Sequence, residues 1–588
     1  MSYDEEYRLM PPMLRLDPYE SCMRHPGAVY CTASMTFVSD EPSPLLTLMQ
    51  EYSEHRSTHF NHTHVLYGTC MTTTCPTFYN TAVDLRLNLE ACRNKTLYEE
   101  YKLRVQVEDD VSCVGGKHDV NQIGPAQIVM AAILIALVML NVIGSLYDVF
   151  CKEKSGPASR LFFCFSVLQN WSRLVAVPGG QDPRKKRFKG FYGIRAILMT
   201  LVISAHSLLP SLLLNENTKF FEELYDQTWI HIFLNGTLIM QIFLQLSAFL
   251  LAYNIQIDPS LCSGTRSVCN LAANLVTIEA KDCQKDWWKH LLYINNYFDH
   301  SYLAADTQLF ALGVIVIVLC KTPRSRKVVL SILFLFGLVV PGLHTYFQDL
   351  DGSLIVSPTT AVDLFVNDPT FNNVYKRGHT NISCYMLGLA CGYLVYYLQE
   401  TNFDVSKYKR WRPVYWALLP FNFCLILLCK LNYAEGPRMD VLYRVAIACL
   451  IKPIFGLATI IIILGIIFKM ENFYRGIFEW RGLSSLGRLS YSAYLLHLAF
   501  IRTTAGIRTT TITGTYISMF EIVLFNLVAT YTAAFIFYIT IETPLGELAK
   551  AILEPKKPEQ KTEDIVEKSD CQNVAKHSVP RVDESHEI

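Results

Sequence analysis

The sequence predicts an all-α, multi-pass transmembrane helix bundle that follows a cysteine-rich extracellular domain. Hydrophobic residues make up 51% of the 588 residues and charged residues only 18%, whereas about a quarter of the residues in soluble proteins are charged. The hydrophobic residues also gather in runs of about 18 to 25, long enough to cross the ~30 Å hydrocarbon layer of a membrane. Lys plus Arg and Asp plus Glu both total 52, so the net charge indicates no nucleic-acid partner.

The first region, 1–120, is predicted to be a disulfide-bonded domain outside the cell or in the lumen, because clustered cysteines beside glycosylation sequons are typical of exported domains. The spacing of the cysteines leaves their pairing open. The disulfide candidates are Cys22, Cys31, Cys70, Cys75, Cys92 and Cys113, and the glycosylation candidates are Asn61 and Asn94. The first 17 residues contain no apolar segment of a signal peptide. We therefore expect either an N-terminus further upstream or a first span that carries its own flank across.

Ten apolar segments follow and are predicted to span the plasma membrane or an endomembrane. They lie at 126–147, 191–214, 232–254, 304–320, 328–348, 382–398, 413–432, 444–468, 489–501 and 518–541. The 148–190 loop carries nine Lys and Arg against three acids, which places it in the cytoplasm because basic loops are retained there. The region 126–190 is thus a first span with a basic cytoplasmic linker, and the polar tail at 546–588 is predicted to be disordered.

The charge pattern requires one more crossing than these segments supply. The third span ends inside near 253, and the fourth must begin outside near 306 to deliver the basic KTPRSRK loop to the cytoplasm. Between them, 256–303 contains no apolar run of sufficient length. A span is therefore expected to be missing from this chain.

Two ionisable residues, Arg195 and His206, lie inside the second predicted span. Eleven residues correspond to three helical turns plus about 20°, so both side chains share one helix face about 16 Å apart. Arg195, near the cytoplasmic end, could bind phosphate groups through paired hydrogen bonds, and a neutral His206 could take a proton from a hydroxyl. The alternative is a snorkelling arginine with a structural, hydrogen-bonded histidine.

Several further blocks accompany this Arg-x10-His pattern. They are FLQLSAFLLAY at 243–253, CQKDWWKHLLYINNYF at 283–298, YLAADTQLF at 302–310, LGRLSYSAYLLH at 486–497 and IETP at 541–544. Together they resemble the acyltransferase type 3 family of membrane proteins, in its animal nose-resistant-to-fluoxetine branch, over about 20 to 545. The resemblance makes 191–545 an acyltransferase-like transmembrane domain. The family has a basic span between the LSAFLL-type helix and the Trp-Trp block, and this chain has no counterpart.

The resemblance implies a membrane O-acyltransferase that moves an acyl group from cytoplasmic acyl-CoA to a hydroxyl of a lipid or other hydrophobic acceptor, without a metal. Arg195 and His206 would be the catalytic residues. The substrate-binding candidates are Asp306, Gln308, Ser247, Tyr494 and His497. Asp306 and Gln308 are expected at the outer mouth of the fourth span, where an ordinary helix-terminal acid is the alternative. For Tyr494, an interfacial aromatic anchor is the alternative.

Two other functions stay open at this point. One is a non-enzymatic membrane protein that transports or presents lipids or small hydrophobic molecules, which the missing basic span favours. The other is receptor-like binding through the cysteine domain. A cluster of His55, His59, His62 and His64 lacks the regular spacing of a metal site, so it is predicted to be a solvated, glycosylated loop.

Overall fold

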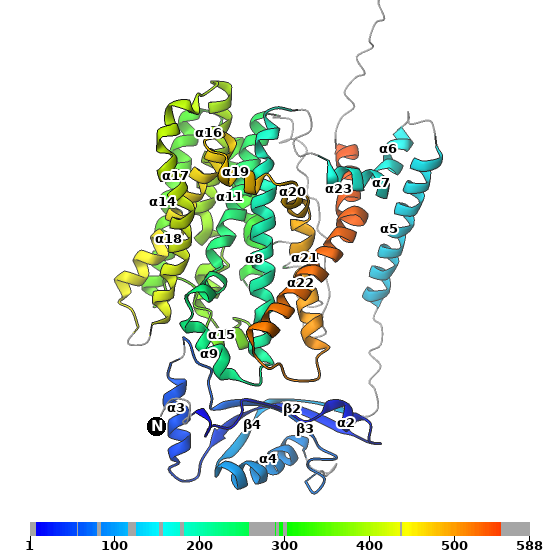
Figure 1. Ribbon diagram of the computed structural model, residues 1–588, viewed down its shortest axis with the longest axis vertical. Helices are drawn as coiled ribbons and strands as arrows, with labels where there is room; N and C mark the ends of the chain where they lie inside the picture. Colours follow the sequence, from blue (N-terminus) through cyan, green and yellow to red (C-terminus); the bar gives the residue numbers. More distant parts are fainter. Residues whose placement is uncertain are drawn as a thin grey trace, which may run out of the picture.

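The computed structural model describes residues 7–553 except 56, 79–83, 116–124, 152–156, 177–181, 258–288, 290–292, 294, 298–302 and 435–437. Figure 1 shows two parts, a small mixed domain at one end and a long helix bundle above it. The small domain corresponds to the predicted cysteine-rich region. The all-α prediction is confirmed for the membrane part, whereas the N-terminal domain contains a β-sheet that the sequence analysis did not foresee.

The N-terminal domain is built on a four-stranded sheet in the order β1-β3-β2-β4, with β1 parallel to β3 and the other pairs antiparallel. Its strands and helices are β1 (Leu14–Leu16), α2 (Tyr19–Met23), β2 (Val29–Val38), α3 (Pro44–Ser53), β3 (His64–Cys70), α4 (Leu85–Tyr101) and β4 (Arg104–Gly115). Residues at every second position of β2, including Ala33, Met35 and Phe37, are buried against side chains of α3 and α4. This is the period of a strand with one covered face.

All six cysteines predicted to form disulfides do so. The pairs are Cys22–Cys70, Cys31–Cys113 and Cys75–Cys92. The second of these joins directly opposed residues of β2 and β4, and the third joins the turn after β3 to α4. Disulfides persist in oxidising compartments, so they support an extracellular or lumenal location of this domain.

Ten helices of the bundle occupy the ten predicted spans. They are α5 (Pro125–Phe150), α8 (Lys189–Leu213), α11 (Thr237–Ile257), α13 (Leu303–Leu319), α14 (Pro323–Phe347), α16 (Ile382–Glu400), α17 (Arg412–Leu428), α18 (Val441–Ile467), α21 (Ser490–Gly506) and α22 (Tyr516–Phe537). Eight of the described helical segments are long and apolar enough to cross a membrane, and the apolar helix at Ala304–Leu319 is shorter. The helix α21, with 17 residues, is also short. The chain is thus a multi-pass membrane protein.

Shorter helices connect the spans at both ends of the bundle. On the side of the basic linker they are α6 (Pro157–Cys164), α7 (Val167–Val175), η1 (Lys185–Phe188), η7 (Val405–Trp411), α19 (Phe473–Phe478), α20 (Arg481–Arg488), η9 (Tyr538–Glu542) and α23 (Thr543–Leu553). On the side of the N-terminal domain they are α9 (Thr218–Asp226), η2 (Thr228–Ile230), α10 (His231–Leu234), η4 (Asn295–Tyr297), α15 (Pro358–Val362), η5 (Phe371–Tyr375), η6 (His379–Asn381) and η8 (Cys429–Tyr433).

The C-terminal tail and the region between the third and fourth spans bear on two predictions about segment boundaries. The tail was expected to be disordered from 546, but α23 continues to Leu553, so its first eight residues are helical; 554–588 lie outside the described residues. The region where a span was expected to be missing, 256–303, is also mostly outside them. The described residues on either side place Tyr253 near Gln399 at the cytoplasmic end of the bundle and Tyr297 near His379 at the other end.

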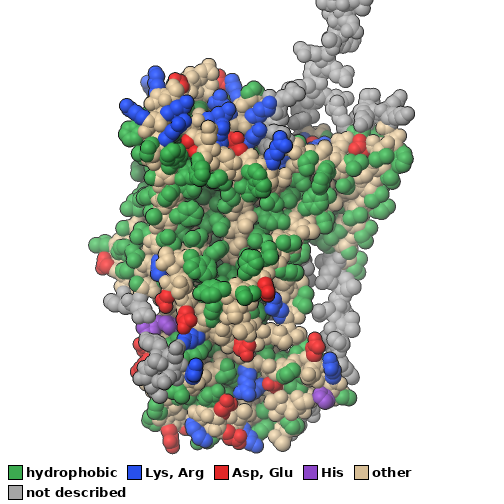
Figure 2. Space-filling view, viewed as in Figure 1, with side chains coloured by type: hydrophobic (Ala, Val, Ile, Leu, Met, Phe, Trp, Pro, Cys, Tyr) green, Lys and Arg blue, Asp and Glu red, His purple; other side chains and the backbone are tan. Residues whose placement is uncertain are grey.

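Charge and hydrophobicity are separated along the bundle. Figure 2 shows Lys and Arg gathered at the end opposite the N-terminal domain and, below them, a band of hydrophobic side chains. Basic residues are retained on the cytoplasmic side of membranes, so this end is cytoplasmic and the N-terminal domain lies on the opposite side.

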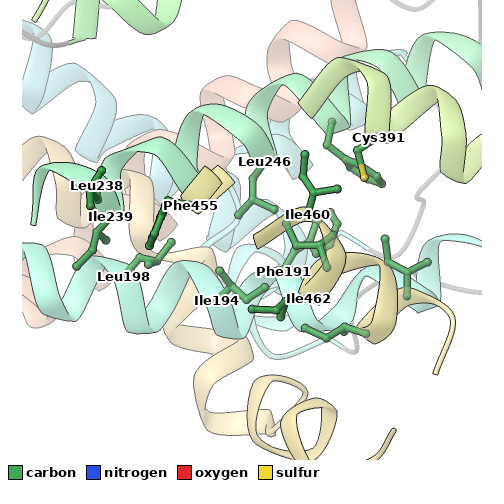
Figure 3. Close-up of a cluster of buried hydrophobic side chains, with 14 of the residues drawn as sticks. Phe191, Ile194, Leu198, Leu238, Ile239, Leu246, Cys391, Phe455, Ile460 and Ile462 are labelled. Carbon is green, nitrogen blue, oxygen red and sulfur yellow. The ribbon is translucent and has the colours of Figure 1, made fainter. Parts of the chain in front are cut away.

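The centre of the bundle is a packed hydrophobic core shared by α8, α11, α16 and α18. Leu198, Leu246, Cys391 and Phe455 represent the four helices in this cluster, and Figure 3 shows them spaced along the helices, with Leu198 and Phe455 close together and Cys391 at the opposite end of the view. By contrast, α5 stands to one side in Figure 1. It is tied to the rest at its cytoplasmic half, where Asn141 Nδ2 donates to the carbonyl of Thr540 at 2.8 Å. Two of these helices, α8 and α11, also line the candidate site.

Candidate functional site

A cavity of about 510 Å³ lies within the bundle between α8, α11, α13 and α21. This volume is in the range of small-molecule sites, roughly 300 to 1,000 Å³. Most of its wall is apolar, and Phe243, Leu251 and Phe310 are examples. The polar side chains on the wall are Arg195, Ser247, Asn254, Asp306, Ser490, Tyr491 and Tyr494. A largely apolar cavity with a few polar groups is suited to an amphipathic ligand.

Arg195, Ser247 and Asp306 come from three different helices and meet at this cavity. Arg195 and Asp306 attract each other electrostatically, and the Ser247 side chain also interacts with the Asp306 carboxyl group. The Oδ1 atom of Asp306 is buried and has no hydrogen-bond partner among the described residues. An incompletely bonded buried carboxyl beside an arginine is a group that a ligand can complete.

Asp306 therefore lies deeper than predicted. The sequence placed it at the outer mouth of its span, but α13 begins only at Leu303 and its 17 residues cover about 25 Å, less than a full bilayer. Its first turn consequently lies inside the bundle, where Asp306 reaches the same cavity as Arg195.

The cytoplasmic half of α8 is fixed by glycines that allow close approach. A Cβ on Gly193 would lie 2.0 Å from the carbonyl oxygen of Phe478 in α19, and a Cβ on Gly487 of α20 would lie 1.9 Å from that of Tyr192. Neither position has room for a larger residue. These contacts seat the segment around Arg195 against α19 and α20, just before the LSYSAYLLH sequence enters α21.

His206 pairs with His497, although they are 291 residues apart in sequence. His206 Nδ1 lies 2.9 Å from His497 Nε2, and the two ring planes differ by 12°. His497 Nδ1 in turn lies 2.6 Å from the carbonyl oxygen of Tyr494. His497 is buried, with 1% exposure. A histidine buried within a membrane bundle needs a hydrogen-bond partner, and His206 supplies it.

The direction of these hydrogen bonds follows from the Tyr494 carbonyl, which is the last group in the series. The Tyr494 carbonyl can only accept, so His497 Nδ1 carries the hydrogen. In neutral His497 the Nε2 atom is then an acceptor, and His206 Nδ1 must donate to it. The remaining nitrogen of His206, Nε2, keeps its lone pair. The pair therefore presents His206 in the tautomer that a general base requires.

The histidine pair lies next to the cavity. Val202, one helical turn before His206 on α8, lines the cavity, and so does Tyr494, whose carbonyl holds His497. Arg195 lies on the same face of α8 two turns further toward the cytoplasm than Val202. The arrangement places a cation at the cytoplasmic part of the cavity and a base beyond its outer part.

Gln308 faces away from this cavity. Gln308 and Asn296 exchange side-chain hydrogen bonds at 2.9 and 3.1 Å, and Gln308 also donates to the carbonyl of Tyr293 at 2.7 Å. Asn296 is fully buried and donates to the carbonyl of Lys376. Gln308 thus ties two segments of the outer side together. The structure gives it a complete set of protein partners instead of a free position on the cavity wall.

The sequence analysis missed Lys452. It lies near the middle of α18, and its Nζ donates to Asn381 Oδ1 at 2.9 Å. Asn381 also accepts from Gln241 Nε2 at 2.9 Å. A lysine inside the predicted span 444–468 was a visible signal, because charged residues within spans usually serve a pathway, a pair or a reaction.

The outer end of the bundle is covered by the segment between α14 and α16 and by the N-terminal domain. Leu354 and Val356 pack with Leu212, and Phe371 joins the same cluster. Phe60 of the N-terminal domain is inserted into it with 2% exposure. Since Leu212 follows His206 by fewer than two turns of α8, these side chains close the outer side above the histidine pair.

A buried glutamate fastens the N-terminal domain to the bundle. Glu222 of α9 accepts hydrogen bonds from the Phe60 backbone N–H at 2.9 Å and the Tyr52 hydroxyl at 3.0 Å, and it lies 2.9 Å from His62 Nε2. Tyr7 adds a hydrogen bond with Thr218. Figure 1 shows α9 at this junction.

The prediction of a solvated histidine loop was therefore wrong for part of the cluster. His62 is buried, with 1% exposure, because it completes the coordination of Glu222. Burial lowers the pKa of the neighbouring His59 below its ordinary value of 6.5. His64 is exposed and contacts Glu108 at 3.2 Å. His62 thus belongs to the contact with the bundle, whereas His64 is the first residue of β3.

The two predicted glycosylation sites lie on the N-terminal domain and are only partly exposed. Asn61 accepts hydrogen bonds from Thr63, and Asn94 Oδ1 accepts from the Val105 backbone N–H at 2.6 Å. Their modification stays a prediction.

Comparison with known proteins gives one distant relative to report. Nose resistant to fluoxetine protein 6 of Caenorhabditis elegans is 23% identical over 504 residues, which covers 72% of this chain and 59% of the worm protein. This chain thus spans about three fifths of that protein's length. No family model matches the chain, and no solved structure matches it. The similarity supports a relationship of this multi-pass membrane protein to the nose-resistant-to-fluoxetine proteins.

Proposed function

We propose that this protein is a membrane O-acyltransferase that transfers an acyl group from cytoplasmic acyl-CoA to a hydroxyl group of a hydrophobic acceptor. The observation that carries the proposal is the hydrogen-bonded relay from the Tyr494 carbonyl through His497 to His206, next to a largely apolar cavity that contains Arg195. An alcohol is a poor nucleophile at neutral pH, so transfer to it needs a positioned base.

In this proposal the acyl chain of the donor occupies the apolar wall between α11 and α13, and Arg195 hydrogen-bonds its polar head. His206 Nε2 takes the proton of the acceptor hydroxyl while the oxygen attacks the thioester carbonyl carbon. The tetrahedral intermediate then collapses, the carbon–sulfur bond breaks, and the CoA thiolate receives the proton from His206. The products are an ester and CoA, and the histidine pair returns to its starting state.

The test measures transfer of a labelled acyl group from acyl-CoA to lipid-extract acceptors by the purified protein in vesicles. His206→Ala should lower the rate by roughly 10² to 10⁴-fold, the usual contribution of a general base. Arg195→Lys should also be damaging, because lysine keeps the charge but loses the planar fork. His64→Ala, at an exposed position of the N-terminal domain, is the control and should retain full activity. Transfer that survives His206→Ala unchanged would overturn the mechanism.

The second candidate function is non-enzymatic transport or presentation of a lipid or small hydrophobic molecule. The predominance of apolar side chains on the cavity wall favours it. Under this alternative the wild-type protein binds long-chain ligands in the cavity but transfers no label with any acceptor. The same vesicle assay, run with a binding measurement, separates the two functions.

A further inference from the structure

Lys452 is a partly exposed cation in the middle of α18 for which the described residues provide no anionic partner. Its Nζ is within hydrogen-bond range of two protein oxygens, Asn381 Oδ1 at 2.9 Å and the Val374 carbonyl at 3.5 Å. Neither atom is charged, and in the described part of the chain no carboxylate forms an ion pair with Lys452 or acts on it electrostatically. An ammonium group can donate three hydrogen bonds. One N–H donor of Lys452 is therefore unused, and its positive charge has no anionic counterpart among the described residues.

The helices around Lys452 contribute further polar groups with unused bonding capacity. Gln241 and Gln245 follow each other by one turn of α11 and are almost completely buried, with 0% and 1% exposure. Gln241 Oε1 and both side-chain polar atoms of Gln245 have no hydrogen-bond partner among the described residues. Buried amides are normally bonded. Unused donors and acceptors on two neighbouring helices indicate a site that is completed by a ligand.

A glycine allows the Gln245 amide to lie close to α18 at this cluster. Gly456 follows Lys452 by one turn of α18, so the two positions share one helix face. A Cβ on Gly456 would lie 2.3 Å from Gln245 Nε2. The absence of that side chain lets the Gln245 amide approach α18 on the face that carries Lys452. The unused amide N–H groups and the lysine are thus on facing sides of the α11–α18 contact.

The polar cluster lies in the same outer half of the bundle as the histidine pair. Asn381 Nδ2 donates to the Tyr375 carbonyl at 3.0 Å, and the Tyr375 side chain is within electrostatic range of Tyr494. The Tyr494 carbonyl holds His497, which holds His206. One molecule that extends from His206 toward α18 would therefore pass from the base to the lysine.

We propose that Lys452 and Gln245 bind an anionic group, a carboxylate or phosphate, of the amphipathic acceptor whose hydroxyl reaches His206. This inference rests on the proposed acyl transfer for the identity of the ligand as acceptor, but the anion site stands on its own contacts. An isolated charge inside a membrane bundle is costly unless it is paired. A bound anion supplies the missing pairing and fills the third donor position of Lys452.

The experiment measures binding and not transfer, so its result is independent of whether the protein is an enzyme. The purified full chain in detergent is titrated with laurate, dodecyl phosphate or 1-dodecanol, three ligands of equal chain length, and the thermal-unfolding midpoint is recorded. Both anions should raise the midpoint more than the alcohol does, because ligands that bind the folded state stabilise it. The stronger of the two anions identifies the class of headgroup.

Three variants test whether the anion-specific rise of the unfolding midpoint depends on Lys452 and Gln245. Lys452→Met should remove the difference between anions and alcohol and weaken anion binding roughly tenfold or more, as expected for loss of a charged hydrogen bond. Gln245→Leu should weaken anion binding while keeping the lysine, and it serves if Lys452→Met fails to fold. Lys430→Met is the matched control, because Lys430 binds the Asp226 carbonyl at the outer surface. An anion-specific shift that persists in both Lys452→Met and Gln245→Leu, or an equal response to all three ligands in the wild type, would overturn the proposal.

Discussion

The carboxyl groups of Glu222 and Asp306 lie in two regions of the molecule and complete their hydrogen bonds differently. At the junction with the N-terminal domain, Glu222 is contacted by Tyr52, by the Phe60 backbone and by His62 at 2.9 to 3.0 Å. In the membrane cavity, Asp306 interacts with the Ser247 side chain and is attracted electrostatically by Arg195. Its Oδ1 atom has no hydrogen-bond partner in the described part of the chain. The first carboxylate is satisfied by protein alone and the second is not.

The difference separates architecture from function. A buried charge whose bonds are complete holds two parts of the fold together, and its removal leaves its partners unsatisfied. A buried polar group with unused bonding capacity is retained at a cost to stability, which is typical of a site that meets a ligand. On this basis the Glu222 junction is structural, and the surroundings of Arg195 and Asp306 are the candidate site.

The largest expected effect on stability concerns the structural region. Glu222→Ala should weaken docking of the N-terminal domain by roughly 3 to 5 kcal/mol, because it leaves His62, Tyr52 and the Phe60 N–H buried without their acceptor. Hydrogen exchange of the backbone around Phe60 measures this directly and should become faster. The neighbouring Glu223→Ala is the control, since the Glu223 side chain is 64% exposed and pairs with Lys219. Equal exchange rates in both variants would contradict a docking role.

A smaller effect is expected at Gln308, which belongs with the structural group despite its position two residues from Asp306. Gln308→Leu should lower stability by roughly 1 to 3 kcal/mol, because the buried Asn296 amide loses its reciprocal partner. The affinity of the Gln308→Leu protein for acyl-CoA should stay close to that of the wild type. Thermal unfolding and equilibrium binding of labelled acyl-CoA measure the two quantities. Gln348→Leu, at an exposed position, is the control for the glutamine-to-leucine change. A large loss of acyl-CoA binding at unchanged stability would move Gln308 into the site.

Several features of the fold were predictable because they depend on local sequence. The spans follow from the length of apolar runs, and the orientation follows from Lys and Arg in short loops. The sheet of the N-terminal domain was missed, although the alternation in VYCTASMTFV at 29–38 is the period of a half-buried strand. The disulfide pairing was not predictable either, because the pairing of Cys31 with Cys113 depends on the register of β2 and β4.

The candidate site was predictable only in part. Arg195 and His206 share a helix, so their spacing placed them on one face. The pairing of His206 with His497 joins residues far apart in sequence and needs the packing of α21 against α8. The roles of Gln308 and His62 depend likewise on Asn296 and Glu222, partners that no local pattern indicates.

The claim that His497 orients His206 as the base is tested by comparing the acyl-transfer rates of His497→Leu and His497→Gln. Leucine removes the acceptor for His206 Nδ1–H and should lower the rate roughly 10- to 100-fold, as expected for loss of a residue that positions a functional group. Glutamine offers a side-chain oxygen to the same hydrogen and should restore most of the rate. If both variants retain the wild-type rate, or if both lose it equally while they remain folded, the relay does not orient the base and the claim is contradicted.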